Sequence, residues 1–361
     1  MAKIRNILVI ANSARMLVQS AVNDDFSPLA IDCFADKDTQ GMALDFVKVT
    51  CLALSNVLLA LSILSKRHTI THVVYGSGFE NYLSTLKYLQ QNFIVLGNSF
   101  KVFSSIQQKT HFFLQLAQQH IVYPETSFQP PDEAEGWLIK PLKGEGGIGI
   151  QRYSVKQETE SIYWQKFCAG TAQSVLFLAN ASEYKIIGFH KQYTAQIYPH
   201  DFVFSGLINQ PDMDESIVQT LHAILSKLVP LFSLKGVNSL DFILNNQQCY
   251  MLEINARPSA SVNLYGSGLF LAHINSCLES ELLSNLNALA SYRAYKIIFA
   301  ETEISIPERM VWPAWVVDIP SNASIINTGM PICSIIAGGK NEQQVDDLLL
   351  LRQQQLIKLL R

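Results

Sequence analysis

Polar side chains that could bind a metal ion alternate with apolar residues in the stretch GVNSLDFILNNQQCYMLEINARPSAS. The polar NNQ segment between two apolar alternations predicts a hairpin. A turn centred on Gln247 pairs Asp241 with Glu253, and the two-residue alternation of a strand places Asn255 on the same face. The opposite face is predicted to be apolar and to hold Leu240, Phe242, Leu244, Leu252 and Ile254.

Two carboxylates and a carboxamide on one face form a set of oxygen ligands that suits Mg²⁺, an ion that proteins usually bind together with phosphates. Arg257 follows Asn255 by two residues and is placed to bind a phosphate or a carboxylate through its guanidinium group. The alternative is a solvent-exposed polar strip with a surface ion pair to Arg257. That alternative accounts for one or two acids, but not for the carboxamide and the arginine in the same row.

A second stretch, KPLKGEGGIGIQRY, places four glycines within six positions: Gly144, Gly146, Gly147 and Gly149. Lys140, Lys143 and Arg152 flank them. Glycine allows the backbone to lie against a ligand, and free backbone N–H groups can hold phosphate oxygens. The stretch lacks the G-K-[ST] ending of a P-loop, so a P-loop NTPase is excluded.

Composition limits the classes of partner. The chain has 361 residues, 48% of them hydrophobic and 16% charged, which predicts two or three packed units. A net charge of −3 gives no basic footprint for a nucleic acid. The six cysteines include no C-x-x-C pair, so we expect free thiols in a reducing cytoplasm rather than disulfides or a zinc site.

Two apolar segments must be compared with the lengths that a membrane-spanning helix and a signal sequence require. The run Val49–Ser65 carries no charge but has only 17 residues, fewer than the ~20 of a bilayer span. We predict a buried helix there, and no membrane association. The N-terminal NILVIA segment is too short for a signal sequence, and we predict a first buried strand.

These groups need a scaffold, which the rest of the chain indicates. Strand-like segments, among them SPLAIDCFA, alternate with helix-like segments through the first hundred residues and predict an open parallel sheet. The loops ANSAR (11–15) and YGSGFE (75–80) follow strands, at the edge where such sheets bind ligands. Neither loop has a full G-x-G-x-x-G, so dinucleotide binding is only weakly indicated, and both are compatible with ordinary turns.

Lys109, then Lys140 ahead of the glycine loop, then Asp241 and the E-x-N-x-R string at Glu253–Arg257 together resemble the ATP-grasp superfamily over residues 1–285. The resemblance implies an α/β (α+β) fold with three parts. These are a Rossmann-like pre-ATP-grasp domain (1–100), an ATP-grasp domain (101–285) with a lid at about 121–185, and a small β-rich C-terminal domain with a terminal helix (286–361).

The resemblance also implies ATP and Mg²⁺ as cofactors, with Mn²⁺ as an alternative ion. It assigns Asp241, Glu253 and Asn255 to the metal, and Lys140 and Arg257 to catalysis. The segment YWQKFCAG resembles the adenine-contacting linker of this family. Lys166 and Gln173 depart from the family pattern, in which an acidic residue of this region contacts ribose. The implied ATP-binding residues are Lys109, Lys140, Lys143, Gly144, Gly146, Gly147, Gln165, Phe167 and Cys168.

The chemistry implied is activation of a carboxylate as an acyl phosphate, attack by an amine and release of ADP. Partners would be small-molecule carboxylates and amines, and many relatives form homodimers. The ANSAR opening and the tail resemble ATP-grasp proteins linked to tetrahydromethanopterin and methanofuran metabolism, which implies glutamate ligation. Two other functions stay open: a biotin-carboxylase-like carboxylase, and a non-catalytic ATP-binding regulatory protein. Two further hypotheses concern the acceptor pocket. His190 and Lys191 would face substrate, with an ordinary strand surface as the alternative, and Ser259 and Ser261 would offer hydroxyls to a substrate carboxylate.

Overall fold

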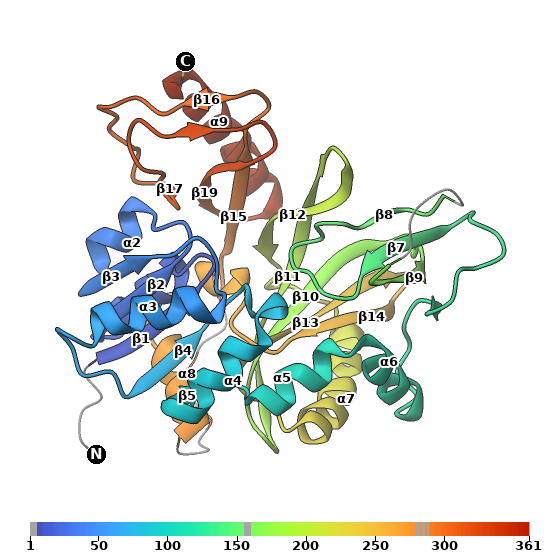
Figure 1. Cartoon of the computed structure of the whole chain (residues 1–361). Coiled ribbons are helices and arrows are strands. Elements are labelled where there is room, and N and C mark those ends of the chain that lie inside the picture. Colours follow the sequence, from blue (N-terminus) through green and yellow to red (C-terminus); the bar gives the residue numbers. More distant parts are fainter. Residues whose placement is uncertain (1–5, 155–159, 279–281, 283–285, 287–288, 361) are drawn as a thin grey trace.

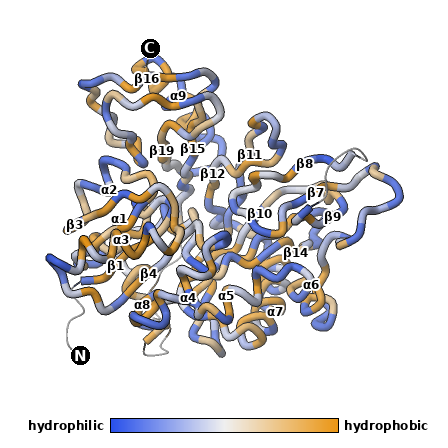
Figure 2. Tube along the Cα trace, viewed as in Figure 1, coloured by the Kyte–Doolittle hydropathy of each residue, from blue (hydrophilic) through white to orange (hydrophobic). Residues whose placement is uncertain are grey.

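The computed structural model describes residues 6–154, 160–278, 282, 286 and 289–360. Figure 1 shows an N-terminal sheet in blue, a long central sheet in green to orange, and the C-terminal segment packed above both. The hydrophobic residues lie along strands such as β1 and along α3, whereas the loop that leads into β7 is mainly hydrophilic (Figure 2).

The N-terminal sheet is wholly parallel, as the alternating sequence predicts, with the strand order β3-β2-β1-β4-β5. The chain first builds outward from β1 to β3 and then returns to add β4 and β5 on the other side of β1. The boundary between β1 and β4 is therefore the topological switch point, where open sheets of this kind bind ligands. The elements are β1 Asn6–Ala11, α1 Arg15–Asn23, β2 Ser27–Asp32, α2 Lys37–Met42, β3 Asp45–Lys48, α3 Leu54–Leu64, β4 His72–Tyr75, a 3-10 turn at Phe79–Asn81, α4 Leu83–Asn92 and β5 Ile94–Leu96.

Two local predictions in this domain need correction. The uncharged run Val49–Ser65 is helical only from Leu54, and Leu58 and Leu59 are 38% and 65% exposed, so α3 is an apolar helix with one face exposed rather than a helix buried all round. The strand predicted from SPLAIDCFA ends at Asp32. The carboxylate of that residue accepts hydrogen bonds from the backbone N–H groups of Ala14 and Phe34, which turns the chain and caps α1.

The central sheet has the order β14-β13-β10-β11-β12-β15-β19-β17. Helix α7 packs with its apolar stripe against the face that carries Leu240 and Phe242, in one core continuous with the N-terminal domain. Helix α8 and the 3-10 turn at Ala260–Leu264 cover parts of the other face, and β8 of the lid contacts β12. The central elements are β10 Thr171–Asn180, β11 Tyr184–Ile197, β12 His200–Asn209, α7 Glu215–Phe232, β13 Lys235–Asn245, β14 Gln248–Asn255, a 3-10 turn at Ala260–Leu264 and α8 Leu269–Leu278.

The lid is a small antiparallel sheet of order β6-β9-β7-β8, reached through two helices. The described parts of this region are α5 Phe100–Gln107, α6 Lys109–Gln118, β6 Thr126–Ser127, β7 Trp137–Pro141, β8 Gln151–Arg152 and β9 Ile162–Lys166.

The C-terminal segment supplies strands to the central sheet, because β15 pairs with β12, and β19 pairs with β15. Helix α9 packs on β15 and β19. The elements are β15 Tyr292–Phe299, β16 Ile304–Ser305, β17 Val316–Val317, β18 Ile325–Ile326, β19 Pro331–Gly339 and α9 Glu342–Leu360. In the part of the chain that the structure describes, no helix combines the length and apolarity that crossing a bilayer requires. All six cysteines are free thiols, as predicted.

Candidate active site

The predicted pairing of Asp241 with Glu253 is confirmed, although the turn differs from the predicted one. Asn245 pairs with Gln248, so the turn holds two residues, and the strands leave it one position out of the predicted register. A β-bulge opposite the Asp241–Phe242 step inserts Leu252 and restores the Asp241–Glu253 pair.

The bulge also corrects the predicted apolar face of β14. Met251 is fully buried with Ile254 in the main core, and Leu252, which was predicted to point there, is only half-buried. On β13, Leu240 and Phe242 are fully buried, as predicted. The extra residue at the bulge moves the inward position from Leu252 to Met251.

The two facing carboxylates have different surroundings. Asp241 accepts a hydrogen bond from Asn255 Nδ2 at 3.1 Å, and burial, reinforced by the charge of Glu253, raises the pKa of Asp241 to about 7. Glu253 forms an ion pair with Lys109 at 3.0 Å. Burial acts to raise the pKa of Glu253, but the nearby cations, led by Lys109, hold it below its ordinary value. Lys109 opens α6, so the first residue of that helix neutralises one of the two acids.

Lys140 is the penultimate residue of β7, and its ammonium group donates to Gln165 Oε1 at 2.6 Å. Gln165 is 1% exposed and is anchored in turn through Thr126 Oγ1 at 3.0 Å. The partner of Lys140 is therefore a neutral amide. Burial, together with the positive charge of Lys109, lowers the pKa of Lys140 to about 8, against the opposing influence of Glu253.

These surroundings fit a magnesium–nucleotide complex, because the hydrogen-bond partner of Lys140 is not an anion and Asp241 faces another acid rather than a cation. Lys140 is driven toward its neutral form and Asp241 toward its protonated form. The Ser239 hydroxyl, paired across the strands with Asn255, is buried and makes no hydrogen bond within the described residues. In that same portion of the chain no three His, Cys, Asp or Glu side chains gather as a metal centre. A metal here would combine Asp241, Glu253 and Asn255 with ligands from a phosphate chain.

Arg257 lies near these acids but already has a partner of its own. Its Nε donates to Glu80 Oε1 at 2.9 Å, and both side chains are more than nine-tenths buried. Its Nη2 lies 3.5 Å from Oε2 of Glu145 in the glycine loop. Sequence reasoning did not select Glu80 or Glu145. The available signals were an acid at the end of the YGSGFE loop and a single acid within the basic glycine loop.

The glycine loop lies against β12 of the central sheet. Gly146, Gly147 and Gly149 have positive φ values of 64°, 75° and 85°. A Cβ on Gly147 would lie 1.9 Å from the carbonyl oxygen of Phe202, and Phe204 N donates to Gly146 O at 2.8 Å. Close backbone contact with β12 therefore requires glycine at 147, independently of any phosphate.

Gly144 has an ordinary φ, and Lys143 is exposed at the start of the loop. In the linker, the backbone N–H groups of Lys166 and Phe167 donate to Glu125 O and Gly136 O. Phe167 is 40% exposed, with the guanidinium of Arg152 5.1 Å from its ring centroid. An adenine contact along Gln165, Phe167 and Cys168 stays a prediction.

His190 and Lys191 point to opposite faces of the sheet, so the two side chains do not both face one site. The strand register places His190 on the face of Asp241 and Lys191 on the opposite face. His190 is fully buried and shares a 2.9 Å hydrogen bond with Tyr265, and burial lowers its pKa to about 3. Lys191 forms a 2.7 Å ion pair with Glu342 of α9. Ser259 and Ser261 hydrogen-bond to each other at 2.8 Å.

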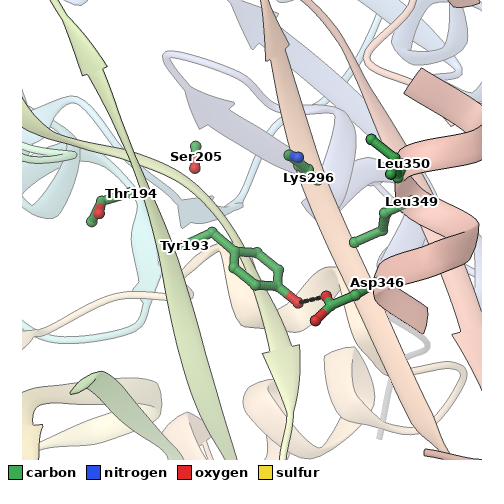
Figure 3. A pocket seen from close by; sticks show the side chains of 7 residues that line it. All are labelled: Tyr193, Thr194, Ser205, Lys296, Asp346, Leu349 and Leu350. Carbon is green, nitrogen blue, oxygen red and sulfur yellow. Dashed lines mark hydrogen bonds between the residues drawn. The ribbon is translucent and has the colours of Figure 1, made fainter. Parts of the chain in front are cut away.

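A cavity of about 270 Å³ lies beneath α9, and neither Asp241 nor Glu253 lines it (Figure 3). Tyr193 and Lys296 both pair with Gly206 and so point to the sheet face opposite Asp241. The Tyr193 hydroxyl donates to Asp346 Oδ1 at 2.8 Å across the cavity. The other lining residues are Thr194, Ser205, Leu349 and Leu350.

Comparison with known proteins identifies the domain that carries the site. A family model described as an ATP-grasp domain matches residues 106–261. An uncharacterized protein of Methanocaldococcus jannaschii is 25% identical over 270 residues, and the match covers 67% of this chain and 63% of that protein. The chain thus spans less than two thirds of that relative.

Two solved structures share the fold over almost the whole chain. The L-amino acid ligase of Bacillus licheniformis has a TM-score of 0.73 at 12% identity and covers 99% of this chain and 98% of its own. The carboxyaminoimidazole ribonucleotide synthase of Aspergillus clavatus, solved with ATP, has a TM-score of 0.73 at 15% identity and covers 99% of each chain. The chain therefore has the ATP-grasp fold, and the segment that the family model matches, residues 106–261, contains the site.

Proposed function

We propose that this protein is an ATP- and Mg²⁺-dependent ligase that activates a carboxylate as an acyl phosphate and joins it to an amine, with release of ADP. The observation that carries the proposal is the pair of opposite charge deficits at Lys140 and Asp241, within one cluster of an ATP-grasp domain. A nucleotide phosphate chain with its magnesium ion supplies both missing charges.

In this proposal the side chains of the cluster divide the electrostatic work. Lys140 and Lys109 neutralise phosphate oxygens, and Lys109 also holds Glu253 in its ionised form. Asp241, Glu253 and Asn255 hold the metal, which offsets the charge of the transferring phosphoryl group when bound. Arg257, fixed by Glu80, faces the anionic substrate. The glycine loop excludes water that would hydrolyse an acyl phosphate.

The finer proposal is that glutamate is the carboxylate donor, in a cofactor-forming ligation of the methanofuran or tetrahydromethanopterin type. Its support is the resemblance of the 11–15 loop and of the C-terminal tail. The biotin-carboxylase-like alternative differs in that it requires bicarbonate, and a regulatory protein would bind ATP without turnover.

The test is phosphate release from Mg·ATP against a panel of carboxylate–amine pairs, led by glutamate with tyramine. Bicarbonate is included in the panel, and Asp241→Ala serves as the blank. Release that requires both partners and is lost in the blank is the expected result. Release that requires bicarbonate alone would establish the carboxylase alternative. Failure to bind Mg·ATP in calorimetry would overturn the proposal.

A further inference from the structure

The carboxylate of Glu145 is inserted into the N-terminal domain, far from its own place in the sequence. Asn12 Nδ2 donates a short hydrogen bond to Glu145 Oε1 across 133 positions of chain, and Arg257 Nη2 lies 3.5 Å from Glu145 Oε2. Glu145 belongs to the glycine loop between β7 and β8 of the lid. The Glu145 side chain of the lid therefore contacts the loop that follows β1 of the first sheet.

The insertion point is the topological switch point of the N-terminal sheet. Asn12 follows β1 directly, and Gly78 lies in the loop after β4. A Cβ on Gly78, whose φ is +102°, would lie 2.5 Å from Cγ of Asn12, so the two loops are in contact. Open α/β sheets bind their ligands in the crevice outside these strand ends. The Glu145 carboxylate therefore lies at the strand ends where open sheets of this topology bind their ligands.

The crevice is organised to hold an anion. Asn12 Oδ1 accepts from the Cys33 thiol at 3.6 Å, which leaves the Nδ2 amide group directed at the carboxylate. Glu80 is 4% exposed and fixes Arg257 from behind, and Gly78 N donates to Glu80 Oε2 at 3.0 Å. These partners keep an amide and a guanidinium aimed at one point, an arrangement suited to a carboxylate.

Glu145 fits this crevice less completely than Glu80 fits Arg257. The Glu145 side chain is 27% exposed, and its Oε2 is buried without a hydrogen bond among the described residues. Glu145 also lies on a glycine-rich loop, whereas Glu80 lies in a 3-10 turn beside a buried strand. Glu145 is therefore the replaceable carboxylate of the two.

We propose that this crevice, formed by Asn12, Gly78 and Arg257, binds the carboxylate group of a substrate, and that Glu145 is an internal occupant which the substrate must displace. The inference rests on the proposed ligase function and adds the location of the carboxylate and its competitor. An attached competitor acts at an effective concentration of order millimolar, so it weakens substrate binding without a new partner. Displacement removes the Glu145 contact between the glycine loop and the first sheet and leaves the backbone contacts of the loop with β12 in place, and this couples carboxylate binding to the attachment of the lid.

The test compares wild-type protein with Glu145→Ala and Glu145→Gln, and uses Glu133→Ala as the matched control. Glu133 is an exposed acid of the same lid. Hydrogen exchange of the peptide 142–153 reports the attachment of the loop. Thermal-shift titrations with sodium acetate and sodium L-glutamate, each matched by sodium chloride, report carboxylate binding. Adding Asn12→Ala to the Glu145→Ala background locates the site.

Exchange of the loop should rise several-fold in both Glu145 variants and stay unchanged in the control. The Glu145→Ala protein should bind a carboxylate probe at least tenfold more tightly than wild type, and adding Asn12→Ala should reverse that gain. Unchanged loop exchange, equal affinity in wild type and variant, or no carboxylate binding by either protein would each overturn the inference. No arm uses ATP, so a failure of the ligase proposal remains distinguishable from a failure of this one.

Discussion

The charge cluster of Lys140 and Asp241 differs from the crevice of Arg257 in how completely its charges are paired. Arg257 and Glu80 form a close, buried ion pair, and Glu145 adds a second carboxylate to it. Lys140 has only an amide partner, and Asp241 faces another acid. The first arrangement stabilises the fold without a ligand, whereas the second costs folding free energy until a ligand supplies the missing charges. Substitutions should therefore have opposite consequences in the two places.

The largest expected effect is on the paired side. Glu80→Gln leaves the buried Arg257 without its closest counter-charge, and we expect a loss of about 3 kcal/mol in the free energy of unfolding, because Glu145 compensates only in part. Urea unfolding measures it. Glu133→Gln, the exposed control, should change the free energy by less than about 0.5 kcal/mol. A loss below about 1 kcal/mol would show that the pair is not the main stabilising contact of the crevice.

On the unpaired side, Lys140→Gln should spare the fold and weaken nucleotide binding. Loss of one charged contact to phosphate costs about 2 kcal/mol, or roughly 30-fold in affinity for Mg·ATP by calorimetry. Stability without nucleotide should be unchanged or higher, because the variant removes a half-buried cation whose hydrogen-bond partner is a neutral amide. Lys101→Gln, at an exposed position of α5, is the control. Destabilisation with unchanged affinity would place Lys140 among the structural ion pairs instead.

The same lysine sets a pH dependence. Below its pKa of about 8 Lys140 is already charged, and above it the protein must take up a proton to bind phosphate. Affinity for Mg·ATP should therefore fall as pH rises above 8, by up to about tenfold per unit. Calorimetry in buffers of different ionisation enthalpy should detect the proton uptake. Lys140→Arg should flatten the profile, and an identical decline in that variant would assign the effect to another group.

The smallest expected change in stability is that of Asp241→Asn, which removes the repulsion between facing carboxylates. We expect a gain of about 0.5–1 kcal/mol in stability without nucleotide, measurable as a higher Tm, together with loss of Mg²⁺-dependent ATP binding. Because the pKa of Asp241 is raised to about 7, the repulsion is present above that pH. The gain should disappear as pH falls below 7. Equal gains at pH 6 and pH 8 would contradict an electrostatic origin.

Periodicity alone was enough to predict the parallel N-terminal sheet and the pairing of Asp241 with Glu253. The pairing nevertheless depended on two features that offset each other, a turn one residue shorter than predicted and the bulge at Leu252. Bulges leave no periodic signal, so the inward position of Met251 could not be predicted.

Groups brought together from distant segments were the other limit of sequence reasoning. Glu145 meets Asn12 across 133 positions, and Arg257 meets Glu80 across 177. Local spacing carries no record of such contacts, which form only when the lid and the segment after β14 pack against the first sheet. The charge of Arg257 could be read from the sequence, whereas the partners that already hold it could not.

The pairing of β15 with β12 has a consequence for the last quarter of the chain. Without it, β12 would be an outer strand with a row of unsatisfied amide and carbonyl groups, a surface that recruits strands from other molecules. A protein shortened before β15 would therefore be expected to self-associate even if its nucleotide site were intact. The C-terminal strands are therefore expected to protect the edge of the central sheet from pairing with strands of other molecules.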